Sequence, residues 1–585
     1  MENPSPTRIC GLCGTFNCPF PQHKCFGTQE TLDNILSFVS APGTLYSVAL
    51  VNRTLTRAVH HLWRSSQDSY IPLLYTLPPD AYEIKVLDGT MPAGMVAVPG
   101  MFAAPTLVLT RDLCPADLDR FAFYASRIRS LDFTPYPKQR KRVSGVVLEP
   151  LQSVWETMPR PRAPLLPQLH HLGIRFDALV NESFEYHLLI GAPITSFNIS
   201  LMRNDVDTAN WDKLTEVLSS YCYTLKAWKI VVASHHNHEA QTFMTPKPAL
   251  MGMYCTLGDD LRVFDAPRLG ICCVTLAHLA GMPHLRKFIF SIDPGQLVLF
   301  TRGPQSEVEF PALEELEIET GNLGDVVALL QRLGMQGLRK LTVVRAHGFW
   351  DIVWELDPFF DVVGRKAAES QSFTVLKLVP SITTTSLPLR LPPISVITDK
   401  TMRPLYRCRT LEHLEMGLGS AVLVHDAGLV DMAIAWPRLR VLKLVESTTR
   451  IWPNATFGGL LQLVSSCQAL EALSIRINGF QPVSKIALAF AVPNSRLKNF
   501  NACTSPVSGA KRTARMIRNL MPSVSNVQFG WRFDDGSGES LFLLEDEADE
   551  QFFQCWCEVS EIVGKEVDEK KKAEKMRRKQ IGFRL

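Results

Sequence analysis

The chain has 585 residues, of which 46% are hydrophobic and 20% are charged, and its formal net charge is +3. These values are typical of a folded protein with several domains or repeats and exclude a disordered chain. The near balance of 61 basic and 58 acidic residues argues against nucleic acid or a membrane surface as the partner. No signal peptide, membrane span or disulfide framework is visible, so we expect a cytoplasmic or nuclear protein with reduced cysteines.

Residues 1–26 form a Cys-rich segment in which five potential zinc ligands fall within 16 residues. They are Cys10, Cys13, Cys18, His23 and Cys25. Thiolate and imidazole groups bind zinc tetrahedrally, and a bound metal would stabilise a segment too short to bury an apolar core. The spacing matches no common zinc finger closely. A structural zinc site and a disordered tail with free thiols therefore both stay open, and we expect no other cofactor.

Residues 27–85 predict a small helical module. The first helix covers 30–39, with Thr28 as its N-cap residue and a Pro-Gly break at 42–43. Two further short helices follow, one carrying Leu45, Val48 and Ala49 and the other carrying Leu55, Val59, Leu62 and Trp63. Three short amphipathic helices bury little area, so the module needs a partner or a neighbouring domain to cover its apolar face.

This module resembles an F-box. The resemblance covers residues 27–78 and rests on the stretches ETLDNILSFV (30–39), SVALVNR (47–53) and LWR (62–64). As in fungal F-box proteins, these are followed by a segment such as DSYIPLLYTLP (68–78). Gly27-Thr28 stands where Leu-Pro is usual, Asn52 where Cys is usual, and Leu55 where an aromatic residue is common.

The resemblance implies that the chain bridges a client protein and a Skp-type adaptor, which connects to a cullin scaffold in a ubiquitin ligase complex. By motif position, the residues that would face the adaptor are Leu32, Ile35, Leu36, Val39, Leu50, Val51, Leu62 and Trp63. The alternative is that the same apolar side chains pack the module's own core or seal it against the rest of the chain.

Residues 86–165 are expected to be a connector or a degenerate capping repeat. Within them, 120–131 predicts a helix that leads into a strand. Terminal units of repeat arrays are usually atypical, and this segment would be the first of such an array.

Residues 166–533 carry a recurring phrase, Leu-x-x-Leu-x-Leu, at 169–174, 285–290, 313–318 and 439–444. Looser copies begin at 194, 225, 338, 373, 411, 470, 497 and 524. Most steps are 25–31 residues, as in leucine-rich repeats, and the longer steps indicate loop insertions. Each unit predicts a short strand followed by a helix, for example 313–318 followed by apolar positions between Val326 and Leu333. The 60-residue interval between Leu225 and Leu285 predicts one further, degenerate copy.

Stacked units of this kind predict an α/β fold, a leucine-rich-repeat solenoid (horseshoe) preceded by the small all-α F-box-like module. Residues between the apolar strand positions would point outward on its concave face, and their mixed charge suits a polar client protein. The candidates for client binding are Glu315, Glu317, Lys340, Thr342, Lys377, His413, Glu415, Arg440, Lys443, Ser474 and Arg476. No catalytic motif is present, so we expect a non-catalytic protein.

Residues 534–585 form an acidic and then basic tail, in which Phe552 and Trp556 are expected to fold back as a cap on the last repeat. The leading hypothesis is a substrate-recognition subunit of a Skp–cullin–F-box ubiquitin ligase. A repeat scaffold without ubiquitin coupling is the alternative, and an enzyme with a closed pocket is a third hypothesis.

Overall fold

The computed structural model describes residues 71–87, 104–132, 142–143, 151, 153–154, 157, 165–176, 194–202, 224–233, 248–292, 309–346, 354–380, 396–417, 421–445, 451–481, 483, 485–529 and 550–565. The chain divides into two compact units, Met1–Ala233 and Ser234–Leu585. The zinc candidates and the eight adaptor-facing candidates lie outside the described residues.

The first unit begins with a small sheet. After the short helix α4 (Ile71–Leu74), strand β1 (Tyr82–Leu87) pairs antiparallel with β2 (Ala104–Leu109). Strand β4 (Arg142–Val143) pairs parallel with β2 on its other side.

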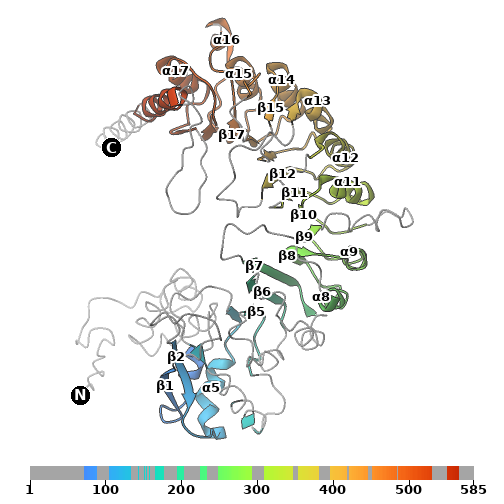
Figure 1. The fold of residues 1–585 in the computed structure, drawn as a ribbon, viewed down its shortest axis with the longest axis vertical. Helices are drawn as coiled ribbons and strands as arrows, with labels where there is room; N and C mark the ends of the chain where they lie inside the picture. Colours follow the sequence, from blue (N-terminus) through green and yellow to red (C-terminus); the bar gives the residue numbers. More distant parts are fainter. Residues whose placement is uncertain are drawn as a thin grey trace, which may run out of the picture. The chain divides into compact units, whose positions relative to one another are not determined.

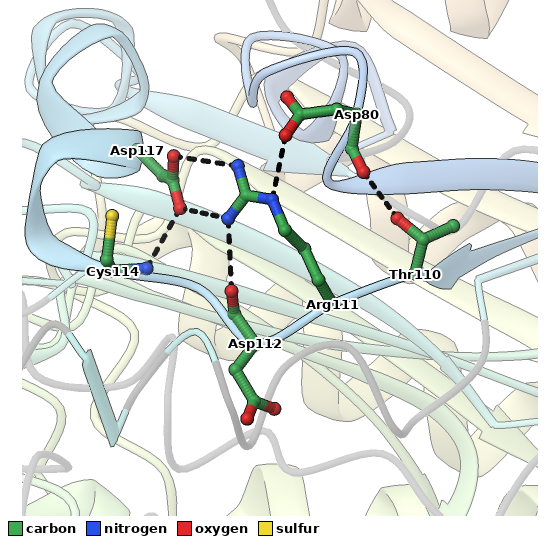
Figure 2. Close-up of polar contacts among 6 residues, drawn as sticks. All are labelled: Asp80, Thr110, Arg111, Asp112, Cys114 and Asp117. Atoms are coloured by element: carbon green, nitrogen blue, oxygen red, sulfur yellow. Dashed lines mark hydrogen bonds and ion pairs between the residues drawn. The ribbon is translucent and has the colours of Figure 1, made fainter.

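The turn after β2 is held by Arg111 (Figure 2). Its guanidinium contacts both carboxylate oxygens of Asp117, at 2.7 and 3.1 Å, and Asp80 at 2.8 Å. Asp117 also accepts the backbone N–H of Cys114 at 2.9 Å, and these hydrogen bonds lower the pKa of its carboxyl group. Arg111 therefore fixes the start of 3-10 helix η3 (Pro115–Asp117), which runs into helix α5 (Leu118–Ala125).

Helix α5 leads directly into the first strand of a parallel ladder, which confirms the helix and strand predicted within 120–131. The strands of this ladder are β3 (Ser130–Asp132), β5 (His171–Phe176), β6 (Ser196–Met202) and β7 (Ala227–Ala233), paired in that order. Leu131, Leu172, Phe197 and Trp228 are register partners, and all four are buried. The rings of Phe197 and Trp228 stack with centroids 5.3 Å apart.

The second unit contains a longer parallel ladder in which each strand pairs with the next one along it. Among the described residues its strands are β8 (Val263–Gly270), β9 (Lys287–Ile292), β10 (Glu315–Thr320), β11 (Lys340–Arg345), β12 (Val375–Pro380), β14 (His413–Met416), β16 (Val441–Leu444), β17 (Ala472–Ile475), β18 (Asn499–Asn501) and β19 (Val527–Gln528). Two other strands, β13 (Val396–Thr398) and β15 (Ala421–Leu423), form a separate parallel pair.

Helices connect these strands and lie along one face of the ladder, as Figure 1 shows for α8 to α15. They are α8 (Pro248–Tyr254), α9 (Cys273–Ala280), α11 (Leu323–Arg332), α12 (Leu356–Glu369), α13 (Asp399–Met402), 3-10 helix η8 (Arg403–Arg407), α14 (Asp426–Ala435), α15 (Phe457–Ser466), α16 (Lys485–Phe490) and α17 (Ala510–Leu520). The alternation of strand and helix confirms the repeat unit predicted from the sequence.

The three apolar positions of the recurring phrase form the core between strands and helices. In the copy at 313–318, Leu313, Leu316 and Ile318 are all at most 4% exposed. Register pairing places Leu316 beside the equivalent apolar residues of β9 and β11, so each repeat covers its neighbours. Burial of one such side chain contributes about 1.5–3 kcal/mol, which a single repeat could not obtain alone.

The degenerate copy predicted between Leu225 and Leu285 is present in strand β8. Its three apolar positions are Leu261, Phe264 and Ala266, and each is fully buried. Phe264 pairs with Phe288 of β9, which places this copy in phase with the next one. The small Ala266 at the third position explains why the phrase is hard to recognise in the sequence.

Successive helix starts are tied together by aspartates. Asp399 accepts the backbone N–H of His425 at 3.1 Å, and Asp426 accepts both the N–H and the hydroxyl of Thr456 at 2.6 Å. A glycine is required beside this contact, because a Cβ at Gly428 would lie 1.9 Å from Asp399 Oδ1. In this way α13 fixes the amino end of α14, and α14 fixes the amino end of α15.

Residues 550–565 form a helix that packs on the last repeat. Trp556, Val559 and Val563 are at most 2% exposed, and the Trp556 indole N–H donates to the carbonyl of Ser505 at 2.8 Å. This helix confirms the predicted cap and covers the apolar end of the repeat array.

Candidate protein-binding surface

The second unit has one sheet face that the helices do not cover, which we call the open face. Side chains alternate along each strand, so the residues between the buried positions point to this face. Strand register aligns them in two rows. The outer row contains Val263, Lys287, Glu315, Lys340, Val375, His413, Val441, Ala472 and Asn499.

The second row, which we call the middle row, lies two residues further along each strand. It contains Asp265, Ile289, Glu317, Thr342, Lys377, Glu415, Lys443, Ser474 and Asn501. The two rows bring together nine of the eleven residues predicted for client binding, which are separated by up to 159 positions in the sequence.

Glu415 is the centre of a charged cluster on strands β12, β14 and β16. Its carboxylate lies 3.1 Å from Lys377 Nζ, 2.9 Å from Lys443 Nζ and 3.1 Å from His413 Nε2. The contact with His413 does most to lower the pKa of Glu415, burial opposes it, and the two lysines lower it further. Two ammonium groups share one carboxylate, so this part of the face carries spare positive charge and spare N–H donors.

Strands β8 to β10 carry the opposite charge. In the two rows, Asp265, Glu315 and Glu317 stand with one lysine, Lys287. Burial raises the pKa of Glu317, Lys340 opposes this, and the carboxylates of Asp265 and Glu315 add to the increase. Between the two zones, Lys340 contacts Glu315 across neighbouring strands at 3.4 Å. The open face is therefore acidic over β8–β10 and basic over β12–β16.

Arg440 lies outside the two rows, immediately before strand β16. It contacts Glu471 at 2.9 Å and Glu412 at 3.9 Å. Glu314 bridges Arg286 and Arg339 in the same way at 3.7 and 3.9 Å. These residues form an alternating row at the edge of the sheet, where the three arginines are more exposed than the lysines of the Glu415 cluster.

Three other predicted residues are buried. Thr342 and Ser474 are 4% and 9% exposed, and Arg476 is 6% exposed. Arg476 lies beyond the middle row near the end of β17 and donates to the carbonyls of Ile451 and Thr504, at 2.5 and 3.1 Å. Arg476 therefore holds two loops together, and the accessible charge of the face is concentrated on the other candidates.

An exposed aromatic cluster was missed by the sequence reasoning. Trp452, Phe480 and Phe552 come from three separate segments, and their ring centroids are 5.7–6.4 Å apart. Trp452 and Phe480 are 56% and 45% exposed. The sequence offered little signal for this cluster, because it is assembled from two loops and the cap helix.

Within the described ranges, no three His, Cys, Asp or Glu side chains are arranged to hold a metal ion. Across those same residues, no helix combines the length and apolar character needed to cross a bilayer.

No family model and no curated protein sequence matches the chain. Solved structures with partial similarity include the complex of Rad7 and Elc1 in yeast, with 12% identity, 69% of this chain and 93% of that chain covered, and a TM-score of 0.30. An internalin (InlF) of Listeria monocytogenes str. 4b F2365 has 12% identity, coverage of 67% and 85%, and a TM-score of 0.29. A Bacteroides fragilis protein has 12% identity, coverage of 42% and 64%, and a TM-score of 0.22.

Proposed function

We propose that the chain is a non-catalytic substrate-recognition subunit of a Skp–cullin–F-box ubiquitin ligase. In this proposal the F-box-like segment at residues 27–85 docks a Skp-type adaptor, and the open face of the second unit binds a client protein. The resemblance in the sequence supports the first part, and the charged rows of the open face support the second.

The Glu415 cluster carries the proposal for the client. Lys377 and Lys443 are 30% and 37% exposed, so they are accessible while Glu415 holds them in place. Positioned ammonium groups of this kind recognise carboxylates with little loss of side-chain entropy on binding. We expect the client to place acidic side chains over β12–β16 and basic ones over β8–β10.

The adaptor part is tested with purified full-length chain and a purified Skp-type adaptor. Wild type is expected to co-purify with the adaptor, and the variant with Leu36→Asp and Leu50→Asp is expected to lose it. The circular dichroism spectrum of the variant serves as the control for folding. If a folded variant recovers as much adaptor as wild type does, the F-box assignment is contradicted.

The client part is tested by proximity labelling in the native cell. Lys377→Glu with Lys443→Glu reverses the basic zone and is expected to remove a set of labelled proteins while adaptor labelling persists. Lys511→Glu with Arg515→Glu is the matched control, because it makes the same charge change on the exposed face of helix α17. A labelled set that is unchanged by the first pair, or changed equally by both, would contradict the assignment of the open face.

A scaffold without ubiquitin coupling is the alternative function, and the departures at Gly27, Thr28 and Asn52 motivate it. Adaptor binding at micromolar concentration would exclude it. The enzyme hypothesis needs a closed pocket with a nucleophile and a base. A cavity of about 640 Å³ beside η8 and α14 is lined by Tyr406, Arg409, Asp431, Ile434, Ala435 and Pro437, and these residues do not form such a pair.

A further inference from the structure

Two cysteine thiols converge on one hydroxyl group between helices α8 and α9. Cys272 Sγ lies 3.3 Å from Thr275 Oγ1, and Cys255 Sγ lies 4.0 Å from the same oxygen. Thr275 is fully buried, whereas both cysteines are partly exposed. The two sulfur atoms come from consecutive repeats and are therefore at most 7.3 Å apart, and both are partly accessible from solvent.

Cys272 occupies the N-cap position of α9 and has extended backbone geometry there. At this position the free N–H groups of the first helical turn point towards the cap side chain. Burial disfavours the thiolate, but the Thr275 hydroxyl and the backbone N–H groups of Thr275 and Val274 outweigh it and lower the pKa of Cys272. A stabilised, accessible thiolate reacts with oxidants faster than an ordinary thiol does.

The pKa values of Cys408, Cys467 and Cys557 are shifted in the opposite direction. Burial raises the pKa of Cys408 to about 12 and that of Cys467 to about 11. Burial also raises the pKa of Cys557, although this residue is exposed. Cys557 is therefore an accessible reference thiol whose pKa is shifted in the other direction.

We propose that Cys272 and Cys255 form a reversible, peroxide-sensitive thiol pair. The Cys272 thiolate attacks hydrogen peroxide, the O–O bond breaks, and the sulfur becomes a sulfenic acid while hydroxide takes up a proton as water. The Cys255 thiol then attacks the Cys272 sulfur, the S–S bond forms and the S–O bond breaks, and the thiol proton leaves with the hydroxide as a second water. The two thiols lose two electrons in total, and the peroxide gains them.

Cys273 is unsuited to resolve the sulfenic acid. Cα atoms of adjacent residues lie about 3.8 Å apart, whereas disulfides usually join Cα atoms about 4.4–6.8 Å apart. Cys255 directly follows helix α8, so it is not a chain neighbour of Cys272 and can approach it from the preceding repeat. The resulting disulfide would join the end of α8 to the start of α9 and so lock two neighbouring repeats together.

The test treats full-length protein with a small excess of hydrogen peroxide and maps its peptides by mass spectrometry with and without reductant. The linked peptide pair containing Cys255 and Cys272 is expected in the oxidised wild type and is expected to disappear on reduction. Iodoacetamide should alkylate Cys272 at least about fivefold faster than Cys557 at pH 7. Absence of the linked pair, or equal alkylation rates, would overturn the proposal.

Three variants separate the roles of the cysteines. Cys255→Ser should leave a sulfenic acid on Cys272 that dimedone traps, and Cys272→Ser should leave Cys255 reduced. Cys273→Ser is the matched control and should keep the linked pair. Oxidation of Cys255 that is unchanged in Cys272→Ser, or loss of the linked pair in Cys273→Ser, would contradict the assignment. The wild-type experiment decides the matter even if a variant fails to fold.

Discussion

Replacing Glu415 by glutamine tests how the open face is held together. Glutamine keeps the shape of the side chain but removes the charge that Lys377 and Lys443 share. Hydrogen bonds to charged groups contribute about 1.5–3 kcal/mol when they are sheltered from water. Glu415 is only 19% exposed, but the lysines are 30% and 37% exposed, so solvent screening reduces the expected loss to about 1–2 kcal/mol.

Native-state hydrogen exchange is the suitable assay, because repeat arrays open locally and a single unfolding free energy is poorly defined for them. In Glu415→Gln, the backbone amides of β12, β14 and β16 should exchange about 5- to 30-fold faster. Glu412→Gln is the control, because Glu412 is 38% exposed and lies 3.9 Å from Arg440. That change should cost less than about 0.5 kcal/mol. Equal effects of the two substitutions would refute the reasoning.

The difference in amide exchange rate between wild type and Glu415→Gln should depend on pH in a direction that the pKa of Glu415 sets. The pKa of Glu415 is lowered from its ordinary value of 4.5 in the folded protein, first by His413. A lowered pKa contributes stability that is fully present above the unfolded-state pKa and is lost as the pH falls through the folded-state pKa. The exchange difference between wild type and Glu415→Gln should therefore shrink as the pH falls below about 4.5.

Three further predictions concern the repeats. Asp426→Ala removes the carboxylate that accepts the backbone N–H and the hydroxyl of Thr456, the N-cap residue of α15, at 2.6 Å. Hydrogen exchange in α15 should become faster by an amount equivalent to about 1–3 kcal/mol. An unchanged exchange rate would contradict the tie between helix starts. Gly428→Ala should lower the midpoint of thermal unfolding, because the added Cβ would meet Asp399. Gly252→Ala is the control and should leave the midpoint unchanged, because nothing lies within 4 Å of a Cβ at that position. Equal midpoints for the two variants would contradict this packing. Trp556→Ala should destabilise the last repeats by about 3–5 kcal/mol, because it removes a buried indole ring. Backbone amide exchange should become faster in α17 but not in α11. A uniform increase in exchange along the chain would contradict a local cap.

The repeat architecture could be predicted because its signal is the periodic apolar core. Leu313, Leu316 and Ile318 are buried in the structure as the phrase requires. The degenerate copy around Phe264 could be placed only by its interval, because a small alanine replaces the third apolar residue. The cap helix was foreseen from the aromatic residues of an otherwise charged tail, and Trp556 is buried.

The chemistry of the open face was predictable only in part. Alternation along a strand indicates which side chains leave the core, so Lys377, Glu415 and Lys443 were found. Whether these side chains meet depends on the register between strands that are far apart in the sequence. A local sequence pattern does not show that register. Alternation also cannot show that the loops cover Arg476, or that Arg440 precedes its strand and lies at the sheet edge.

The most direct test of client binding is lysine footprinting of the assembly purified from cells. Acetylation of Lys377, Lys443 and Lys511 is compared by mass spectrometry in the assembly and in the isolated chain. We predict that Lys377 and Lys443 become protected in the assembly and that Lys511, on the helix side, does not. Unchanged reactivity of Lys377 and Lys443 together with protection of Lys511 would contradict binding on the open face.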